Sequence, residues 1–549
     1  MDLSTRRWLL LAVAVILVAN LTLPFRPDGA LISVPLSEDG FYSLTIARNI
    51  AAGRGISYDG VLPTNGFQPL ITFVQAGLFR VAGGDDGLAL RLVLGLSWAV
   101  LGLTAWVVAG VARGASSSFE TRPEGRLHPS RRALAGAPQD EDMNHKRLPH
   151  PEEAAKPPSR RVALHGVVAA ILYLAALPLW LHHFNGLETG LLLLLYALLW
   201  RAWQLGLPET IGGRIGCGVI LGLLVLARID AAIFVAVLAV AEMAAAWWRQ
   251  GPLPAVARAA VLGGTALLVS LPWWLYNWLE FGSLMPISGT AQQLVALDPL
   301  RLRWAIMAVG ADLVPWVWVG VDWGSPIQFV PAILAVLGLI AWRLRRGRGS
   351  NPRDIPDSIR RSRRYAVALV LAMAALAVWY CLSSFAFWFY GRYLVPLALP
   401  GIVLAAGLIA PRLQRRPALS LALPLLVAPV LAAAILGWQG RGFYGTINFR
   451  EQAVLVAEEV PAGEWVAAGQ SGTLGFVRSH VLNMDGKVNP EVHGWRDRPW
   501  EYLRARNVRW FVDWEWYVWR SLGPEPERNG WRKVAERDKF LLYRYEGDD

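Results

Sequence analysis

The sequence predicts a polytopic α-helical membrane protein with about eleven transmembrane helices, followed by a small α/β domain. Composition is the first reason, because 54% of the 549 residues are hydrophobic and only 17% are charged, a balance typical of membrane proteins. Second, apolar stretches of spanning length recur throughout residues 1–438. Third, residues 439–549 are polar and of mixed periodicity, which indicates a water-exposed domain large enough for its own core.

The candidate spans follow one another along the first 438 residues. The first span comes directly after Arg6 and Arg7, with no convincing small-residue cleavage site behind it, so we expect an uncleaved signal anchor. Arg228 and Asp230 interrupt one long apolar run, which favours two short spans joined by a tight charged hairpin. The candidate spans are residues 8–23, 88–112, 163–181, 187–205, two within 213–248, 256–278, 326–342, 365–385, 393–410 and 418–438.

Residues 67–82 are apolar but too short for a bilayer crossing, and they carry Gln68, Gln75 and Arg80. We expect a helix that lies at the membrane interface. Charge placement supports this choice, because the strongly basic segments then all fall on one side, as the positive-inside rule requires. These segments are the N-terminus and residues 113–161, 201–214, 249–258, 343–364 and 412–416.

The sequence predicts a multi-pass protein of the cytoplasmic (inner) membrane. Its N-terminus is expected to lie in the cytoplasm. Residues 24–87, which form the first outer loop, and residues 439–549 lie outside. The formal net charge of +12 is then explained by topology, so nucleic acid is not an expected partner. Cys217 and Cys381 both fall in apolar stretches, so no disulfide framework is expected.

The cytoplasmic loop of residues 113–161 is rich in Pro, Ser, Arg and Glu, and we expect it to be disordered. It contains Asp140, Glu141 and Asp142, a pattern that resembles the DxD metal motif of nucleotide-sugar enzymes. No Gly-rich strand–helix unit surrounds the motif, so a solvated acidic patch is the better interpretation.

The C-terminal domain shows alternating short elements bounded by turn residues. Helices are predicted at residues 451–460 and 501–506, and strands at 465–468, 481–484, 508–513 and 540–545. Six tryptophans crowd this domain; some are expected in its core or at the membrane, and the rest could stack on acceptor sugars. They are Trp495, Trp500, Trp510, Trp514, Trp516 and Trp519.

The acidic pair Glu38-Asp39 stands just outside the first span. Ser37 is a good helix N-cap, and carboxylates in a first turn stabilise a helix by about 0.3–1 kcal/mol, so a purely structural role is open. A helix at residues 41–50 has an apolar face suited to lie against the membrane, and a glycine-rich polar loop follows it. Polar loops held at a membrane surface tend to carry function, which favours a catalytic role for the pair.

The segment EDGFYSLTIARNIAAGRGISYDGVLPTNGFQPL (residues 38–70) resembles the first outer loop of membrane glycosyltransferases of the C-type (GT-C) fold. These include aminoarabinose and protein mannosyltransferases and, more closely, the mycobacterial terminal arabinofuranosyltransferase and its uncharacterised bacterial relatives. Later segments are similar in the same order. They are NGLET (185–189), LARID (226–230), YN (276–277), FGSLMP (281–286), GRYLVP (391–396) and VLNMDGKVN (481–489).

The resemblance implies transfer of a hexosyl or pentosyl group from a polyprenyl-phosphate carrier to an acceptor outside the membrane, with inversion at the anomeric carbon. The acceptor would be a glycan, a lipid or a protein. The family more often has Asp in the first acidic position, whereas this chain has Glu38. Asp39 is therefore the favoured catalytic base, with Glu38 as helper, and Glu38 as the base is the alternative.

The leaving phosphate needs cationic donors, and arginine binds phosphate oxygens in pairs. Arg392 and Arg228 stand at predicted outer ends of spans. Each could instead snorkel to the interface, and Arg228 could simply pair with Asp230. His183, beside His182, is a further phosphate candidate, although polar packing at the interface is the simpler role.

Candidate substrate-binding residues lie close to the acids or at outer helix ends. Asn65 could instead form a turn, and Glu188 could cap a helix. No metal site and no cofactor are expected, although a divalent cation stays possible. The candidates are Tyr42, Asn65, Gln68, Asn185 and Glu188.

Two other functions stay open. A lipid or glycan transporter or flippase is one, but the odd number of predicted spans and the absence of repeated halves speak against it. A non-catalytic glycan-binding member of the same fold is the other, since Glu38 departs from the usual pattern.

Overall fold

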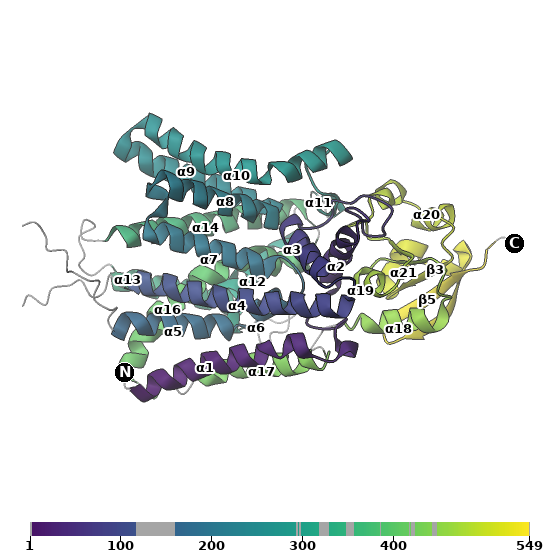
Figure 1. The fold of residues 1–549 in the computed structure, drawn as a ribbon, viewed down its shortest axis with the longest axis horizontal. Coiled ribbons are helices and arrows are strands. Elements are labelled where there is room, and N and C mark those ends of the chain that lie inside the picture. The colour runs from purple at the N-terminus through teal and green to yellow at the C-terminus, as the bar shows by residue number, and fades with distance from the viewer. Residues whose placement is uncertain are drawn as a thin grey trace, which may run out of the picture.

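The computed structural model describes residues 3–116, 160–291, 295, 298–317, 329–346, 356–384, 386–416, 418, 423–441 and 447–547. These residues form an elongated bundle of helices with a smaller α/β unit at one end (Figure 1). The loop predicted to be disordered, with its acidic patch at residues 140–142, lies outside the described residues except at its helical ends.

The long helices coincide with the predicted spans. Six are long and apolar enough to cross a membrane, and seven if a pair bent by 66° counts as one span, so the described residues form a multi-pass membrane protein. The helices at the predicted spans are α1 (Leu3–Leu21), α4 (Asp86–Ser116), α5 (Arg160–Leu174) with α6 (Leu177–Phe184), α7 (Thr189–Leu205), α8 (Ile211–Ala227), α9 (Ala232–Gln250), α10 (Pro252–Phe281), α13 (Val330–Arg346), α14 (Asp357–Ser383), α16 (Ala398–Arg415) and α17 (Leu423–Trp438).

Two breaks in these helices bring polar groups toward the end of the bundle. The bent pair is α5 and α6, where Pro178 stands in the first turn of α6. The predicted hairpin at Arg228 and Asp230 is confirmed, because α8 ends at Ala227 and a short 3-10 helix leads into α9. A chain break of this kind frees backbone groups and places charged side chains where a cavity can receive them.

Among the described helices of the bundle, the sequence did not predict the short α11 (Ile287–Ala291) or α12 (Pro299–Leu313). Helix α12 packs against α13 and α16. Arg301, Arg303 and Asp312 interrupt its sequence, so it does not read as an apolar span.

Residues 24–87, predicted as the first outer loop and called the outer loop below, contain α2 (Glu38–Ala51) and α3 (Pro69–Val81). Ser37 caps α2 as predicted, because its side chain accepts a hydrogen bond from the backbone N–H of Gly40. The expectation that the apolar face of α2 lies against the membrane is wrong. Phe41 and Leu44 on that face are fully buried in protein, and the Phe41 ring lies 5.2 Å from the ring of Phe476. Helix α3 is short and apolar as expected, and its place at the interface stays a prediction.

Residues 447–547, here called the tail, contain a five-stranded mixed sheet with the order β2-β1-β3-β5-β4. The parallel strands are β1 (Val466–Ala468), β2 (Val481–Asn483) and β3 (Trp510–Asp513); the antiparallel strands are β4 (Trp531–Arg537) and β5 (Phe540–Tyr545). The helices are α18 (Arg450–Glu459), α19 (Gly472–Val477), α20 (Pro499–Ala505) and α21 (Glu515–Leu522). Sequence reasoning missed α19 and α21, which are short, and β4, whose exposed face is charged.

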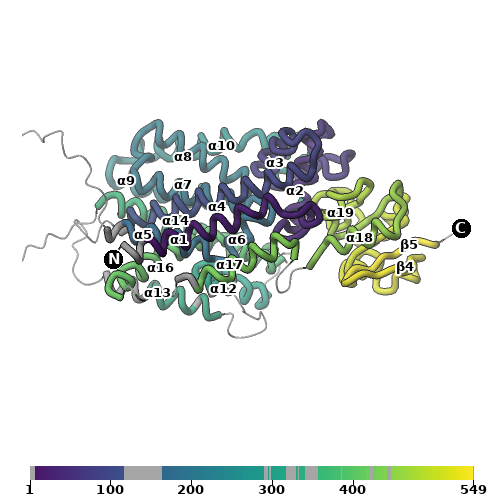
Figure 2. The backbone as a smooth tube through the Cα atoms, turned by 60° about the horizontal axis from the view of Figure 1, so that its bottom comes forward, coloured from purple at the N-terminus to yellow at the C-terminus, as the bar shows by residue number. Residues whose placement is uncertain are grey.

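Both views place the tail beside α2, at the end of the bundle away from the N-terminus (Figures 1 and 2). Helix α19 packs directly on α2. Helices α2 and α19, more than 400 residues apart in the sequence, therefore share one region of the molecule.

Candidate functional site

The contact between the outer loop and the tail is too close for side chains at two positions. A Cβ atom at Gly66 would stand 1.6 Å from the carbonyl oxygen of Lys487, and one at Gly472 would stand 2.2 Å from the carbonyl oxygen of Glu38. Backbone atoms cannot yield as a flexible side chain can, so glycine is required at both positions. The backbone of the tail thus packs directly on the start of α2 and on the loop before α3.

Asp39 lies between two cations. Lys487 Nζ donates to Asp39 Oδ1 at 3.1 Å, and Arg392 Nη1 donates to Asp39 Oδ2 at 3.0 Å. Burial alone would raise the pKa of Asp39, but the charges of Lys487 and Arg392 outweigh burial and lower that pKa to about 2. The carboxylate is therefore ionised at physiological pH.

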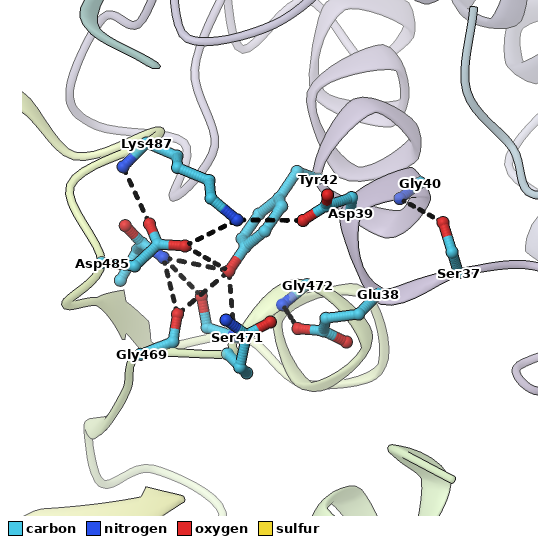
Figure 3. A network of polar contacts seen from close by, with 12 residues as sticks. Ser37, Glu38, Asp39, Gly40, Tyr42, Gly469, Ser471, Gly472, Asp485 and Lys487 are labelled. Carbon is cyan, nitrogen blue, oxygen red and sulfur yellow. Dashed lines mark hydrogen bonds and ion pairs between the residues drawn. The ribbon is translucent and has the colours of Figure 1, made fainter. Parts of the chain in front are cut away.

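Glu38 has a different environment, although it is the neighbouring residue. Its carboxylate accepts hydrogen bonds from the backbone N–H of Thr473 at 2.9 Å and from Thr473 Oγ1 at 2.6 Å, and a third from the backbone N–H of Gly472. Burial raises the pKa of Glu38 to about 7, against the effect of these bonds. Figure 3 shows that the two carboxylates point to different segments of the tail, Glu38 to α19 and Asp39 to Lys487.

Tyr42, one turn further along α2, joins the same network (Figure 3). Its hydroxyl lies 3.1 Å from the carbonyl oxygen of Gly469 and 3.3 Å from Asp485 Oδ2. The backbone N–H of Ser471 donates to that hydroxyl at 3.1 Å. Asp485 also lies 3.4 Å from Lys487 Nζ. This network holds Lys487 in place beside Asp39.

Arg228 lies in a second cluster. Its Nη1 donates to Glu188 Oε1 at 2.8 Å, and its guanidinium binds both carboxylate oxygens of Asp230, with Nε at 3.1 Å from Oδ1. The guanidinium also lies 4.5 Å from the centre of the Tyr393 ring. The pair with Asp230, expected as the alternative to phosphate binding, is therefore present.

Two cavities open on either side of Asp39. Cavity 1, of about 720 Å³, lies between the start of α2 and the tail, and its lining includes Glu38, Trp388, Trp514, Trp516 and Tyr517. Cavity 2, of about 850 Å³, lies at the ends of α10 and α14, and its lining includes Tyr42, Arg228, Trp274, Trp379 and Lys487. The residues that line both cavities are Asp39, Leu187 and Arg392.

Most of the predicted site residues line one of the two cavities. Cavity 1 is lined by Glu38 and Asn185, and cavity 2 by Tyr42, Gln68, Glu188 and Arg228. Asn65 and His183 are in the lining of neither.

Asn65 and His183 have structural contacts instead. Asn65 is fully buried; its side chain donates to Asn277 Oδ1 at 3.1 Å and accepts from the backbone N–H of Ile287 at 3.0 Å. His183 is also buried, with Nε2 at 2.8 Å from the hydroxyl of Tyr173.

Sequence reasoning assigned no role to Lys487 or Thr473. Lys487 stands in VLNMDGKVN, a segment already noted for its family resemblance, so that signal was available. Nothing in the sequence pointed to Thr473. Among the described residues, no group of three or more His, Cys, Asp or Glu side chains is placed to hold a metal ion.

No protein-family model matches the chain, and no curated protein is significantly similar to it in sequence. Solved structures do match. The Archaeoglobus fulgidus oligosaccharyltransferase in complex with Zn and sulfate is 12% identical, with a TM-score of 0.51, over 91% of this chain and 67% of that one. Its apo form is 12% identical, with a TM-score of 0.50, over 100% and 76%. ArnT from Cupriavidus metallidurans is 15% identical, with a TM-score of 0.49, over 98% of each chain.

Similarity at this level of identity concerns the fold. The chain has a GT-C-like fold, mostly helical with a C-terminal mixed sheet, as the sequence predicted. The closer resemblance to the mycobacterial terminal arabinofuranosyltransferase stays a prediction.

Proposed function

We propose that the chain is an inverting glycosyltransferase that moves a sugar from a polyprenyl-phosphate carrier to a cell-envelope acceptor. The reaction would take place on the outer face of the cytoplasmic membrane. The observation that carries this proposal is the position of Asp39, an ionised carboxylate at the junction of two separate cavities. A transferase for two substrates needs such a junction, because the donor and the acceptor must meet at the base.

Cavity 2 is the better site for the donor. It opens among the ends of α10 and α14, two helices long and apolar enough to cross a membrane, where a prenyl chain would lie. Trp274 and Trp379 supply apolar walls, and Arg392 supplies a cation for the carrier phosphate. Gln68 and Glu188 in the same lining offer polar atoms to sugar hydroxyls.

Cavity 1 is the better site for the acceptor. The tail contributes Trp514, Trp516 and Tyr517 to its wall, and the membrane bundle contributes Trp388. Aromatic rings of this kind stack on the apolar faces of sugars. Asn185, also in the lining, offers an amide to hydroxyl groups.

The chemistry at the junction follows from the two carboxylates. Asp39 Oδ accepts the proton of the acceptor hydroxyl while that oxygen attacks the anomeric carbon. The bond between the anomeric carbon and the phosphate oxygen breaks on the opposite face, so the configuration inverts. Glu38 is less well placed for this step, because it lines cavity 1 only, whereas Asp39 lines both cavities.

The test is replacement of Asp39 in cells that lack the native chain. Cells that carry Asp39→Asn should lack one residue or linkage in the envelope glycans, as the deletion does, and should accumulate the lipid-linked donor. Mass spectrometry of the glycans and of the lipid fraction measures both effects. The matched control is Asp28→Asn, because Asp28 lies in the same outer loop, has a side chain that is 87% exposed, and lines neither cavity.

Full restoration of the glycan by Asp39→Asn, at equal protein levels, would contradict the proposal. An unchanged glycan profile in the deletion itself would favour the non-catalytic, glycan-binding alternative.

A further inference from the structure

The cations that line cavity 2 are all engaged by carboxylates before any donor arrives. They are Arg228, Arg392 and Lys487. Arg228 is held by Glu188 and Asp230. Arg392 and Lys487 are both held by Asp39, and Lys487 Nζ also lies 3.4 Å from Asp485 Oδ2. A phosphate that enters this cavity must therefore compete with a carboxylate for each positive charge.

The two groups of cations differ in how easily they can exchange partners. The side chain of Arg228 is only 5% exposed, and the two carboxylates that bind it, Glu188 and Asp230, are 2% and 12% exposed. The side chains of Arg392 and Lys487 are 18% and 16% exposed at the cavity. Arg392 Nε makes no hydrogen bond within the described part of the chain, so this guanidinium has donor capacity left. Its guanidinium carbon lies 4.6 Å from the centre of the Phe389 ring, a cation–π contact that uses none of its N–H groups.

The proposed reaction moves negative charge from Asp39 to the carrier. Before transfer, the carboxylate and the phosphodiester each carry one negative charge. After transfer, the acceptor proton has neutralised the carboxylate, and the departing phosphate monoester carries two charges. The total is unchanged, but the charge that Arg392 and Lys487 neutralise has left Asp39 and has appeared on the phosphate.

We propose that Arg392 and Lys487 form a cation pair shared between the base and the leaving group, with Lys487 as a phosphate ligand supplied by the tail. In the resting protein the pair holds Asp39 ionised and in position. When the donor binds, the pair turns toward its phosphate, which frees Asp39 to accept the acceptor proton. The inference rests on the proposed function and adds Lys487 to its donor-binding residues.

If the cation pair is shared, loss of the Asp39 charge should raise the affinity for a prenyl phosphate. Asp39→Asn removes the carboxylate that competes for the pair, so it should bind a prenyl phosphate more tightly, although it should be inactive. Lys487→Met removes one of the two cations, so it should bind more weakly. A charge-assisted hydrogen bond corresponds to an affinity change of about tenfold, and we expect changes of that size in each direction.

The experiment is a binding titration of the full chain in detergent with farnesyl phosphate, with farnesol as the uncharged reference ligand. The variants are Asp39→Asn, Lys487→Met and Lys487→Arg, which restores the charge and should recover most of the affinity. Lys533→Met is the control, because Lys533 lies on the tail and pairs with Glu536 on the surface. Near-UV circular dichroism checks that each variant is folded.

Two results would overturn the inference in distinguishable ways. If the wild type prefers farnesyl phosphate to farnesol but Asp39→Asn binds it no more tightly, the shared pair is wrong and the proposed function survives. If the wild type shows no preference for the phosphate, the donor class is wrong and both proposals fail.

Discussion

Neighbouring carboxylates in the first turn of α2 have opposite properties because their side chains reach different partners. Asp39 faces two cations, which keep it ionised. Glu38 faces the backbone N–H groups of Gly472 and Thr473, where burial raises its pKa to about 7. The two residues therefore have different roles: Asp39 is the candidate base, and Glu38 is a positioning residue that binds the tail.

The raised pKa of Glu38 predicts a pH dependence of stability with a definite sign. In the unfolded chain Glu38 has an ordinary pKa of 4.5 and loses its proton first, while the folded protein retains the proton up to about pH 7. The folded state is therefore favoured at low pH, and this contribution is lost as the pH rises from about 5 to about 7.

Glu38→Gln removes this titration. The melting temperature of the wild type, relative to that of the variant, should fall between about pH 5 and about pH 7 and stay constant above that range. Differential scanning fluorimetry at a series of pH values measures the difference. A difference that is constant across the range, or that rises with pH, would show that Glu38 is ionised in the folded protein throughout.

At the scale of elements, the contact of the tail with the loop before α3 depends on the absence of a side chain at Gly66. Alanine there would place its Cβ atom 1.6 Å from a backbone oxygen of the segment that carries Lys487. Overpacking of this kind costs about 1–3 kcal/mol. That cost should loosen the tail and move Lys487 away from Asp39.

Gly66→Ala should therefore increase hydrogen exchange in α2 and α19 and reduce transfer, while the membrane helices keep their protection. The matched control is Gly463→Ala in the tail, where no heavy atom lies within 4 Å of the added Cβ. Equal hydrogen exchange in the two variants would mean that the contact between Gly66 and the tail tolerates the added methyl group.

The elements themselves were predictable where apolar runs are continuous. Residues 8–23 and 256–278 were expected as spans and are helical in α1 and α10. Helix α12 was missed because its charged side chains, buried at Arg301 and Asp312, break the apolar pattern. The apolar face of α2 was visible in the sequence, but its burial partner, Phe476, is more than 400 residues away, so membrane contact was the wrong inference.

For the site, the sequence indicated residues that are unusual in their local surroundings. Asp39 and Arg392 are charged groups next to apolar spans, and the structure brings them to 3.0 Å. Lys487 stands in a segment noted for its family resemblance, but only the fold shows that it reaches Asp39. Conversely, Asn65 was a candidate for substrate binding and His183 for phosphate binding, and both are buried, because local sequence does not show which polar side chains the core will enclose.

At the scale of the whole molecule, the candidate site lies between two parts of the chain that would face the same side of the membrane. Figure 1 places the N-terminus at the end of the bundle opposite the tail, and the connection from α9 to α10 lies at that same end. Residues 249–258, one of the basic segments predicted to be cytoplasmic, contain this connection. The positive-inside rule then puts Asp39 and both cavities outside.

The predicted orientation of the chain in the membrane can be measured by labelling single cysteines. Cys217 and Cys381, the native thiols, are first replaced by Ala and Ser. Arg528→Cys on the tail, where the side chain is 79% exposed, should react with a membrane-impermeant maleimide in intact spheroplasts. Gln250→Cys, exposed at the end of α9, should react only after permeabilisation. The reverse pattern would put Asp39 in the cytoplasm, and an acceptor outside the membrane could then not reach it.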